Sequence, residues 1–216
     1  MVDGCKKKGC VVVDLDNTLL RCNSTKKLSF FLVGKLIAGW EFNDLGQVGI
    51  ALIKRKLGLI PHRILKHTIL KSARKNFSAD DIDLFAQKLI GELNETVCGI
   101  ISDYTDCRVL IATAATDMFM QAFVKKLPFK ADFSASAYTD DAEKYVDNLG
   151  RQKLKSVEEY LNEKDCVLTT FITDHSDDLP LLKHNKGRNF LVKPSKKTLK
   201  VLRKGGVTEG MYEIIK

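Results

Sequence analysis

The stretch from Val11 to Leu20 constrains the fold of this chain more than any other part of the sequence. It begins with three valines and continues as Asp-Leu-Asp-Asn-Thr-Leu-Leu from Asp14 onward. A β-branched run that opens into carboxylates is typical of a buried parallel strand with polar groups at its carboxyl end. Open α/β sheets have their sites at that end. Asp14 and Asp16 project to the same side because side chains alternate along a strand, so the two acids share one small space.

Two carboxylates that lie so close repel each other, and the pair therefore requires a cation or one bound proton. A strand end followed by an Asx turn is the simpler interpretation, since Asp and Asn are common in turns. A calcium-binding loop fits less well, because Thr18 and Leu19 stand where such a loop has an acidic residue and a glycine.

The composition is that of a globular protein, with 44% hydrophobic and 29% charged residues in a chain of 216. This length allows one domain, or one domain that carries an insert. The formal net charge of +8 favours anionic partners, which include phosphorylated metabolites, nucleic acid and acidic membrane surfaces. The six cysteines form no C-x-x-C pair, so we expect free thiols in a reducing compartment and no zinc site.

The sequence shows neither a secretory signal nor a membrane span. The basic start at Lys6 to Lys8 is followed by only five residues before Asp14, fewer than the roughly 7–15 apolar residues of a signal core. The most apolar longer segment, residues 28–40, contains Lys35 and is shorter than the roughly 20 residues of a membrane helix. We therefore expect no transmembrane helix and a cytoplasmic location.

Helical periodicity replaces the strand pattern between residues 21 and 97. Four helices are predicted, at 25–38, 43–57, 61–75 and 79–95, separated by Gly39, Gly58 and the segment 76–78. Ser78 stands at the N-cap of the last helix, with Asp81 in the capping-box position. Four helices without an intervening strand predict an inserted α-helical bundle, a cap domain, over residues 21–97.

Strands and helices alternate after Cys98. Strands are predicted at 108–112, 131–138, 166–173 and 190–192, and helices at 117–127, 151–161, 179–184 and 195–204. This alternation indicates an α/β fold with a doubly wound, mostly parallel, Rossmann-like sheet. Residues 1–20 and 98–216 would form this core, with the helical cap inserted between its first and second strands.

Three later strand ends also carry candidate site residues. The second strand leads into Thr113 and Ala114, where a hydroxyl and small residues let backbone amides approach an anion, although an N-cap threonine is an equal alternative. Lys153 begins a helix, with Lys155 as a competing choice. The strand at 166–173 ends in Asp-His-Ser-Asp-Asp, and a solvated helical turn explains three acids less well than one.

These four stretches, in this order, resemble the four motifs of the haloacid dehalogenase-like hydrolase superfamily over the whole chain. The segment from Asp14 to Thr18 matches D-x-D-x-T, Thr113 the hydroxyl motif, Lys153 the lysine motif, and Asp174 with Asp178 the D-x-x-x-D motif. The helical insert and the short distance from Lys153 to Asp174 are similar to the phosphoserine phosphatase-like branch.

The sequence also departs from that branch. Residues 21–24, Arg-Cys-Asn-Ser, lack the acidic residue that binds the substrate amino group in phosphoserine phosphatases. Thr173 and Asp177 replace the glycine and asparagine often found in the fourth motif of that branch. The sequence therefore does not indicate phosphoserine as the substrate.

The resemblance implies a phosphatase that hydrolyses a small-molecule phosphate monoester with Mg²⁺, and the residues suit that chemistry. Asp14 would be the nucleophile that forms an aspartyl-phosphate, and Asp16 the general acid and base. The oxygen ligands of Mg²⁺ would be the Asp14 and Asp174 carboxylates and the Asp16 backbone carbonyl. The remaining expected roles are phosphate binding by Thr113, Ala114 and Lys153, and support by Asp178 and Thr18.

Two rival classes fit less well. A two-component receiver domain also combines acids, a threonine and a lysine, but it lacks a late acidic cluster and a helical insert. A non-catalytic anion-binding protein of the same fold would not need every catalytic position. Aromatic-rich RNA-binding signatures are absent, so no nucleic-acid partner is expected.

The expected cap is strongly basic. Residues 26–75 contain eleven Lys or Arg residues and two acidic residues, and residues 28–40 add an apolar, aromatic first helix. On the helix at 61–75, we predict that Arg63, His67, Lys71 and Arg74 line one face. Two interpretations stay open. The apolar stripe packs inside the bundle and the lysines are solvated, or the cap rests on an anionic membrane surface or admits a bulky lipid phosphate.

Overall fold

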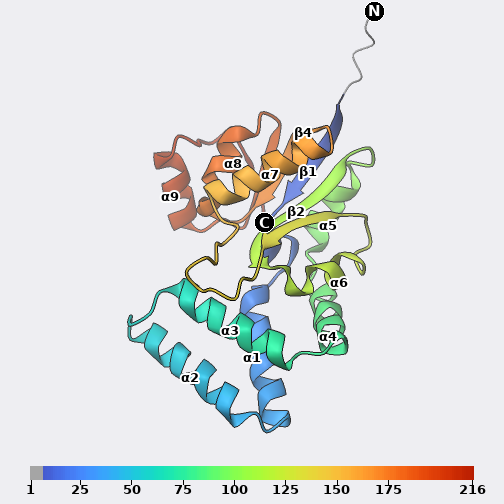
Figure 1. The fold of residues 1–216 in the computed structure, drawn as a ribbon. Helices are drawn as coiled ribbons and strands as arrows, with labels where there is room; N and C mark the ends of the chain where they lie inside the picture. Colours follow the sequence, from blue (N-terminus) through green and yellow to red (C-terminus); the bar gives the residue numbers. More distant parts are fainter. Residues whose placement is uncertain (1–6) are drawn as a thin grey trace, which may run out of the picture.

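A parallel sheet forms the centre of the molecule, as predicted, and it has six strands that are all parallel (Figure 1). The computed structural model describes residues 7–216, so the expectations for Cys5 and Lys6 lie outside the described residues. The strand order is β3-β2-β1-β4-β5-β6, which places β1 between β2 and β4. The strands are β1 (Lys8–Val13), β2 (Arg108–Thr116), β3 (Asp132–Ser136), β4 (Cys166–Thr173), β5 (Arg188–Val192) and β6 (Glu213–Ile215).

Both faces of the sheet are covered by helices, because side chains alternate along the strands. Val11 and Val13 point into one hydrophobic cluster, which α4 (Ala79–Ile90), α5 (Glu95–Ser102) and α6 (Met120–Val124) complete. Cys10 and Val12 point into the other, together with α7 (Arg151–Glu163), α8 (Leu179–His184) and α9 (Lys196–Lys204). The doubly wound α/β prediction is therefore confirmed.

The other three helices form a separate layer beyond the carboxyl ends of the strands (Figure 1). They are α1 (Ser24–Ala38), α2 (Phe42–Lys56) and α3 (His62–Asn76), and they share a third hydrophobic cluster that includes Leu32, Val48 and Ile69. We use the term cap for α1 to α3. The fourth predicted helix behaves differently, because Phe85, Ala86 and Leu89 of α4 belong to the sheet-side cluster.

The end of α4 differs from the prediction. The helix was expected to continue to Glu95, but it ends at Ile90 and is followed by Gly91. Leu93 then forms an antiparallel bridge with Leu20, and the Asn94 amide donates to the Leu19 carbonyl at 2.8 Å. The two chain segments that lead into and out of the helical region thus lie side by side, which requires extended backbone where periodicity alone would continue the helix.

Three other elements also differ from the sequence expectations. The second strand continues through Thr116 instead of ending at Ala112, and its register with β3 shifts between these two residues. Short α5 and the three-residue edge strand β6 were not predicted, because segments of this length carry too few periods of a hydrophobic pattern. Among the helices described within residues 7–216, none is long and apolar enough to span a membrane.

Candidate functional site

The site begins where β1 ends. The Asp14 amide donates to the Ile172 carbonyl of β4 at 2.9 Å, which holds the first acid at the edge of the sheet. Asn17 then adopts a left-handed conformation, with φ of 57°, and its amide donates to the Cys22 carbonyl at 3.1 Å. Asn tolerates this conformation better than most residues. The turn brings the chain back, and the Asp16 carboxylate accepts the Ser24 amide at 2.8 Å at the first turn of α1.

Lys153 projects from the first turn of α7 into a buried ion-pair network. Its Nζ atom lies 2.8 Å from Asp14 Oδ1 and 2.7 Å from Asp178 Oδ1, and the side chain is 2% exposed. Lys155, the competing choice in the sequence, is 68% exposed and lies 3.8 Å from Glu159 on the same helix. The structure thus places Lys153, and not Lys155, beside the first motif.

The acids that follow β4 complete the cluster. The Thr173 hydroxyl donates to Asp178 Oδ2 at 2.7 Å, so the threonine at the strand end fixes this buried carboxylate. The Thr18 hydroxyl donates to Asp174 Oδ1 at 3.4 Å, which links the first motif to the fourth. Asp177 is half exposed, and its carboxylate lies 3.1 Å from Nδ1 of His175. The four motifs therefore meet at one edge of the sheet.

Thr113 is buried but lies inside β2, not at a helix start as predicted. The residue that caps the following helical turn is Thr116, whose hydroxyl accepts the Met118 amide at 3.3 Å. The Thr113 hydroxyl accepts the Ala115 amide at 2.9 Å. A hydroxyl has one proton to donate in addition to its acceptor lone pairs, so Thr113 keeps a donor for a ligand.

A cavity of about 220 Å³ lies among these residues. Every predicted catalytic and phosphate-binding residue lines it, and so does Asp174. Its further walls come from the turn after β1, the loop before α7 and the segment after β4. The complete lining is Asp14, Asp16, Asn17, Asn23, Thr113, Ala114, Ala115, Leu149, Lys153, Asp174, His175, Asp177 and Asp178.

Burial dominates the electrostatics of the acids. It raises the pKa of Asp14 to about 7, with Asp178 and Asp174 adding to the shift and Lys153 opposing it. Burial also raises the pKa values of Asp16 and Asp174. For Lys153 burial opposes the charged form, but the Asp14 and Asp178 carboxylates outweigh it and raise its pKa. Its two carboxylate partners thus favour the charged form of Lys153.

The donor set suits a hard divalent cation. The cavity is lined by five aspartates and one lysine, so one ammonium group faces more negative charge than it can balance. Within residues 7–216 no three His, Cys, Asp or Glu side chains converge into a ready-made metal cluster. The expected set does not need one, because it combines the Asp14 and Asp174 carboxylates with the Asp16 backbone carbonyl.

Sequence reasoning missed several residues that hold the site together. Asn148 is buried, and its side-chain amide donates to the Thr113 carbonyl at 3.2 Å and to the Ser134 carbonyl at 3.0 Å. Lys66 of α3 donates to the Ala114 carbonyl at 2.6 Å and forms an ion pair with Asp147. No local pattern could reveal these contacts, because they join residues far apart in the chain.

The predicted basic face of α3 lies partly against the protein and partly in solvent, where Lys71 and Arg74 are exposed. Arg63 pairs with Glu143 at 3.0 Å, and the guanidinium of Arg74 lies 4.8 Å from the Tyr138 ring centroid. His67, predicted on the same face, is 7% exposed and stacks on Tyr138. The loop 137–150 thus packs against part of that face. Contact of the cap with an anionic membrane surface stays a prediction.

Comparison with protein families identifies the chain. Residues 11–183 match the model of the haloacid dehalogenase-like hydrolases, and the chain belongs to this family. The match spans all four motifs, from the strand that carries Asp14 to the helix after Asp178. No curated protein sequence matches this chain.

Solved structures share the fold at low sequence identity. A Bordetella pertussis Tohama I protein of unknown function is 15% identical, with a TM-score of 0.71 over 98% of this chain and 99% of that one. A probable phosphoserine phosphatase from Vibrio cholerae is 11% identical, with a TM-score of 0.61 over 89% of this chain and 58% of that one. A substrate-bound phosphoserine phosphatase is 12% identical, with a TM-score of 0.56 over 91% of this chain and 90% of that one. The predicted likeness to the phosphoserine phosphatase-like branch is confirmed at the level of the fold.

Proposed function

We propose that the protein is a magnesium-dependent phosphatase that hydrolyses a small phosphate monoester through an aspartyl-phosphate on Asp14. The observation that carries the proposal is the position of Asp14, buried at the carboxyl end of the central strand and lining the cavity. Lys153 holds its Oδ1 atom at 2.8 Å. Among residues 7–216 no hydrogen bond engages the other carboxylate oxygen, which is therefore the one available for attack.

Each residue has a defined part in this mechanism. Asp14 attacks the phosphorus in line, and the bond to the leaving-group oxygen breaks as the aspartyl-phosphate forms. Asp16 gives its proton to the leaving oxygen and then takes one from the water that hydrolyses the aspartyl-phosphate. Burial favours the protonated form of Asp16 that the first step requires. Lys153, the Thr113 hydroxyl and the Ala114 amide hold the phosphoryl oxygens.

Mg²⁺, bound by Asp14, Asp174 and the Asp16 carbonyl, would supply positive charge for the phosphoryl oxygens. Asp178 holds Lys153 in place, and the Thr18 hydroxyl orients the Asp174 carboxylate. These two contacts give physical content to the supporting roles expected for Asp178 and Thr18. A non-catalytic anion-binding protein of the same fold is the alternative, and it would need no half-buried proton donor at Asp16.

Two isosteric substitutions test the proposal. Asp14→Asn keeps the shape but removes the nucleophile and a metal ligand, so we expect hydrolysis of p-nitrophenyl phosphate to be abolished. Asp16→Asn removes proton transfer and should lower kcat by about 100-fold or more. Circular dichroism verifies that both variants are folded. Substantial magnesium-dependent turnover by Asp14→Asn would exclude the mechanism.

Metal removal is a separate test. Because all proposed ligands are oxygens, we expect activity to be lost in chelator, restored by Mg²⁺ and not restored by Zn²⁺. Activity that survives exhaustive chelation would contradict the proposed metal site but not the membership of the family.

A further inference from the structure

A second, larger cavity opens from the first one. Its volume is about 600 Å³, within the range of about 300–1,000 Å³ that is typical of pockets for small ligands. It lies between the cap and the carboxyl edge of the sheet. The two cavities share six lining residues, so whatever is attached to a phosphate in the first cavity extends into the second. The shared residues are Asp16, Asn23, Ala114, Ala115, Leu149 and Asp177.

The cap side of this second cavity is predominantly apolar. All three cap helices contribute to it, with Val33 from α1, Val48 from α2 and Ile69 from α3. Three more apolar side chains line it, and these are Phe30, Leu52 and Leu65. Ile69 and Val48 are buried within the cap cluster, so this part of the wall is packed, whereas Phe30 and Leu52 are exposed.

Three charged residues that line the cavity, Lys66, Asp16 and Asp177, already have partners, whereas Lys26 and His62, which also line it, are exposed. Lys66, which is 4% exposed, is bound to the Ala114 carbonyl and to Asp147. Asp16 accepts the Ser24 amide, and Asp177 pairs with His175. The third lining carboxylate, Asp147, is paired with Lys66, so an ammonium placed in the cavity would lose hydration without meeting an unengaged carboxylate, which is costly. The cavity therefore disfavours a zwitterionic leaving group such as serine.

We propose that the substrate is the phosphate monoester of an apolar alcohol, whose hydrocarbon part occupies the second cavity. This inference rests on the proposed phosphatase activity and adds the chemistry of the leaving group. Burial of hydrocarbon provides the binding energy, and the phosphate end is held by Lys153 and Thr113. Both a dissolved alkyl, prenyl or aryl phosphate and a single-chain lipid phosphate have this chemistry.

A series of n-alkyl phosphates from ethyl to octyl, used below their micelle concentrations, tests the proposal. Transfer of one methylene from water to an apolar site is worth up to about fourfold in affinity. We therefore expect kcat/KM to rise by about two- to fourfold per methylene, and O-phosphoserine to be a poorer substrate than butyl phosphate. Equal kcat/KM across the series, or a preference for O-phosphoserine, would overturn the apolar leaving group while leaving the phosphatase itself intact.

Variants locate the effect in the second cavity. Val33→Gln places an amide on the half-buried cavity wall and should lower the octyl-to-ethyl ratio of kcat/KM by about tenfold. Ile37→Gln is the matched control, because Ile37 lies one turn further along α1, is 56% exposed and does not line the cavity. Its ratio should equal that of the unchanged protein. Equal ratios in all three proteins would contradict the assignment of this cavity to the leaving group.

Binding without turnover separates this inference from the proposed function. The dissociation constants of methylphosphonate and octylphosphonate, measured by calorimetry with Mg²⁺, should differ by at least tenfold in favour of octylphosphonate even in Asp14→Asn. Equal affinities would overturn the inference whether or not the protein is active.

A monoacyl glycerol phosphate, offered dissolved and then in phosphatidylcholine vesicles, distinguishes a soluble phosphate ester from a membrane lipid as the substrate. Faster hydrolysis of the dissolved form supports a soluble ester, and faster hydrolysis in vesicles supports a membrane lipid.

Discussion

At the scale of single residues, Lys153 is the side chain on which the site depends most. It forms ion pairs with two buried carboxylates, Asp14 and Asp178, from a position that is 2% exposed. Removal of one member of a buried ion pair leaves an uncompensated charge and costs about 3–5 kcal/mol. We expect Lys153→Met to lower the free energy of unfolding by an amount in that range, and to abolish hydrolysis.

Lys155→Met is the matched control for this prediction. Lys155 lies two residues further along the same helix, and its contact with Glu159 is exposed. A surface substitution of this kind changes stability by less than about 0.5 kcal/mol. Urea unfolding of both variants provides the measurement, and equal destabilisation would show that the buried network contributes nothing particular to stability.

The same scale shows what could be predicted. The sequence predicted that Asp14, Asp16, Asp174 and Asp178 lie together, because strand ends place polar groups at one edge of the sheet. They do line one cavity, while their catalytic and metal-binding roles stay predictions. Lys153 was preferred to Lys155 only because of the family resemblance. In the structure the two differ clearly, because Lys153 is buried beside Asp14 and Lys155 is exposed. Lys66 was one of the eleven basic residues counted in residues 26–75, with no partner predicted for it. Its contact with Asp147 spans 81 residues of chain, which no local pattern encodes.

At the scale of elements, the start of α4 follows directly from its sequence. The Ser78 hydroxyl accepts the Asp81 amide, and the Asp81 carboxylate accepts the Ser78 amide, which forms the predicted capping box. Ser78→Ala should lower the free energy of unfolding by about 1 kcal/mol. Asp80→Asn alters an exposed side chain outside the capping box and should change the free energy of unfolding by less than about 0.5 kcal/mol. Equal effects of the two substitutions on thermal unfolding would contradict a stabilising role of the capping box.

The capping box also predicts a dependence on pH. The Lys35 ammonium and the Ser78 amide lower the pKa of Asp81 from 3.8 to about 2. A carboxyl with a lowered folded-state pKa adds stability that is fully present above about pH 5 and is lost as the pH falls towards 2. Asp81→Asn should therefore be less stable than the unchanged protein at pH 6, with the difference shrinking below pH 4. A constant difference between pH 6 and pH 3 would contradict this.

Elements without such signals were not predicted correctly. The edge strand β6 has three residues, and α5 has eight, so neither shows a repeated period. The second strand was predicted to end at Ala112, although it continues past a shift in register to Thr116. Local propensity does not determine where a strand ends when a neighbouring strand continues to pair with it.

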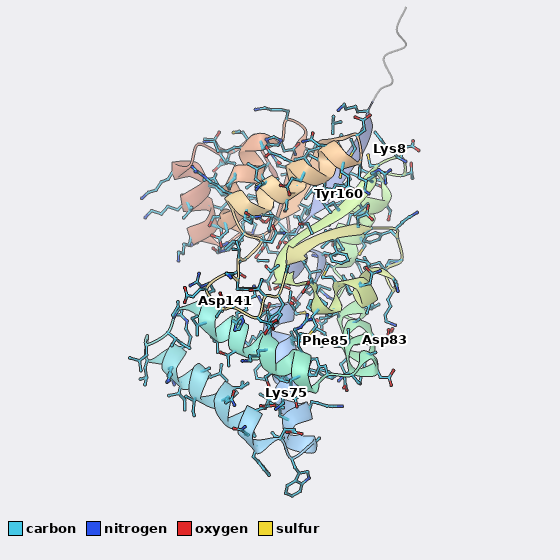
Figure 2. All side chains as sticks on the ribbon, in the orientation of Figure 1. Lys8, Lys75, Asp83, Phe85, Asp141 and Tyr160 are labelled. Carbon is cyan, nitrogen blue, oxygen red and sulfur yellow. The ribbon has the colours of Figure 1, made fainter. Side chains whose placement is uncertain are left out.

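At the scale of the whole molecule, the loop 137–150 joins β3 to α7 and packs against α3 of the cap (Figure 1). Figure 2 labels Asp141 in this loop, next to α3, and Lys75 towards the far end of that helix. Tyr138 stacks on His67 with ring centroids 5.3 Å apart, and the His67 Nε2 atom lies 2.9 Å from the Thr139 carbonyl oxygen. With the Lys66–Asp147 ion pair, these contacts fix the cap over the cavity.

Loss of that ion pair should therefore loosen the connection without unfolding the sheet. In Lys66→Met we expect faster hydrogen exchange over the loop 137–150 and α3, with exchange in β1 and β4 unchanged. Lys71→Met, an exposed substitution on the same helix, is the control and should leave exchange as it is. If the loop exchanged at the same rate in all three proteins, the ion pair would not hold the cap.

The central claim is that Asp14 accepts the phosphoryl group, and a crystal structure with Mg²⁺ and beryllium fluoride tests it most directly. Beryllium fluoride adds to carboxylates as a mimic of a transferred phosphoryl group. The proposed mechanism predicts beryllium bonded to a carboxylate oxygen of Asp14, with Lys153 and Thr113 on its fluorides and Mg²⁺ held by Asp14 and Asp174. An adduct on a serine, a cysteine or any other carboxylate would contradict the mechanism.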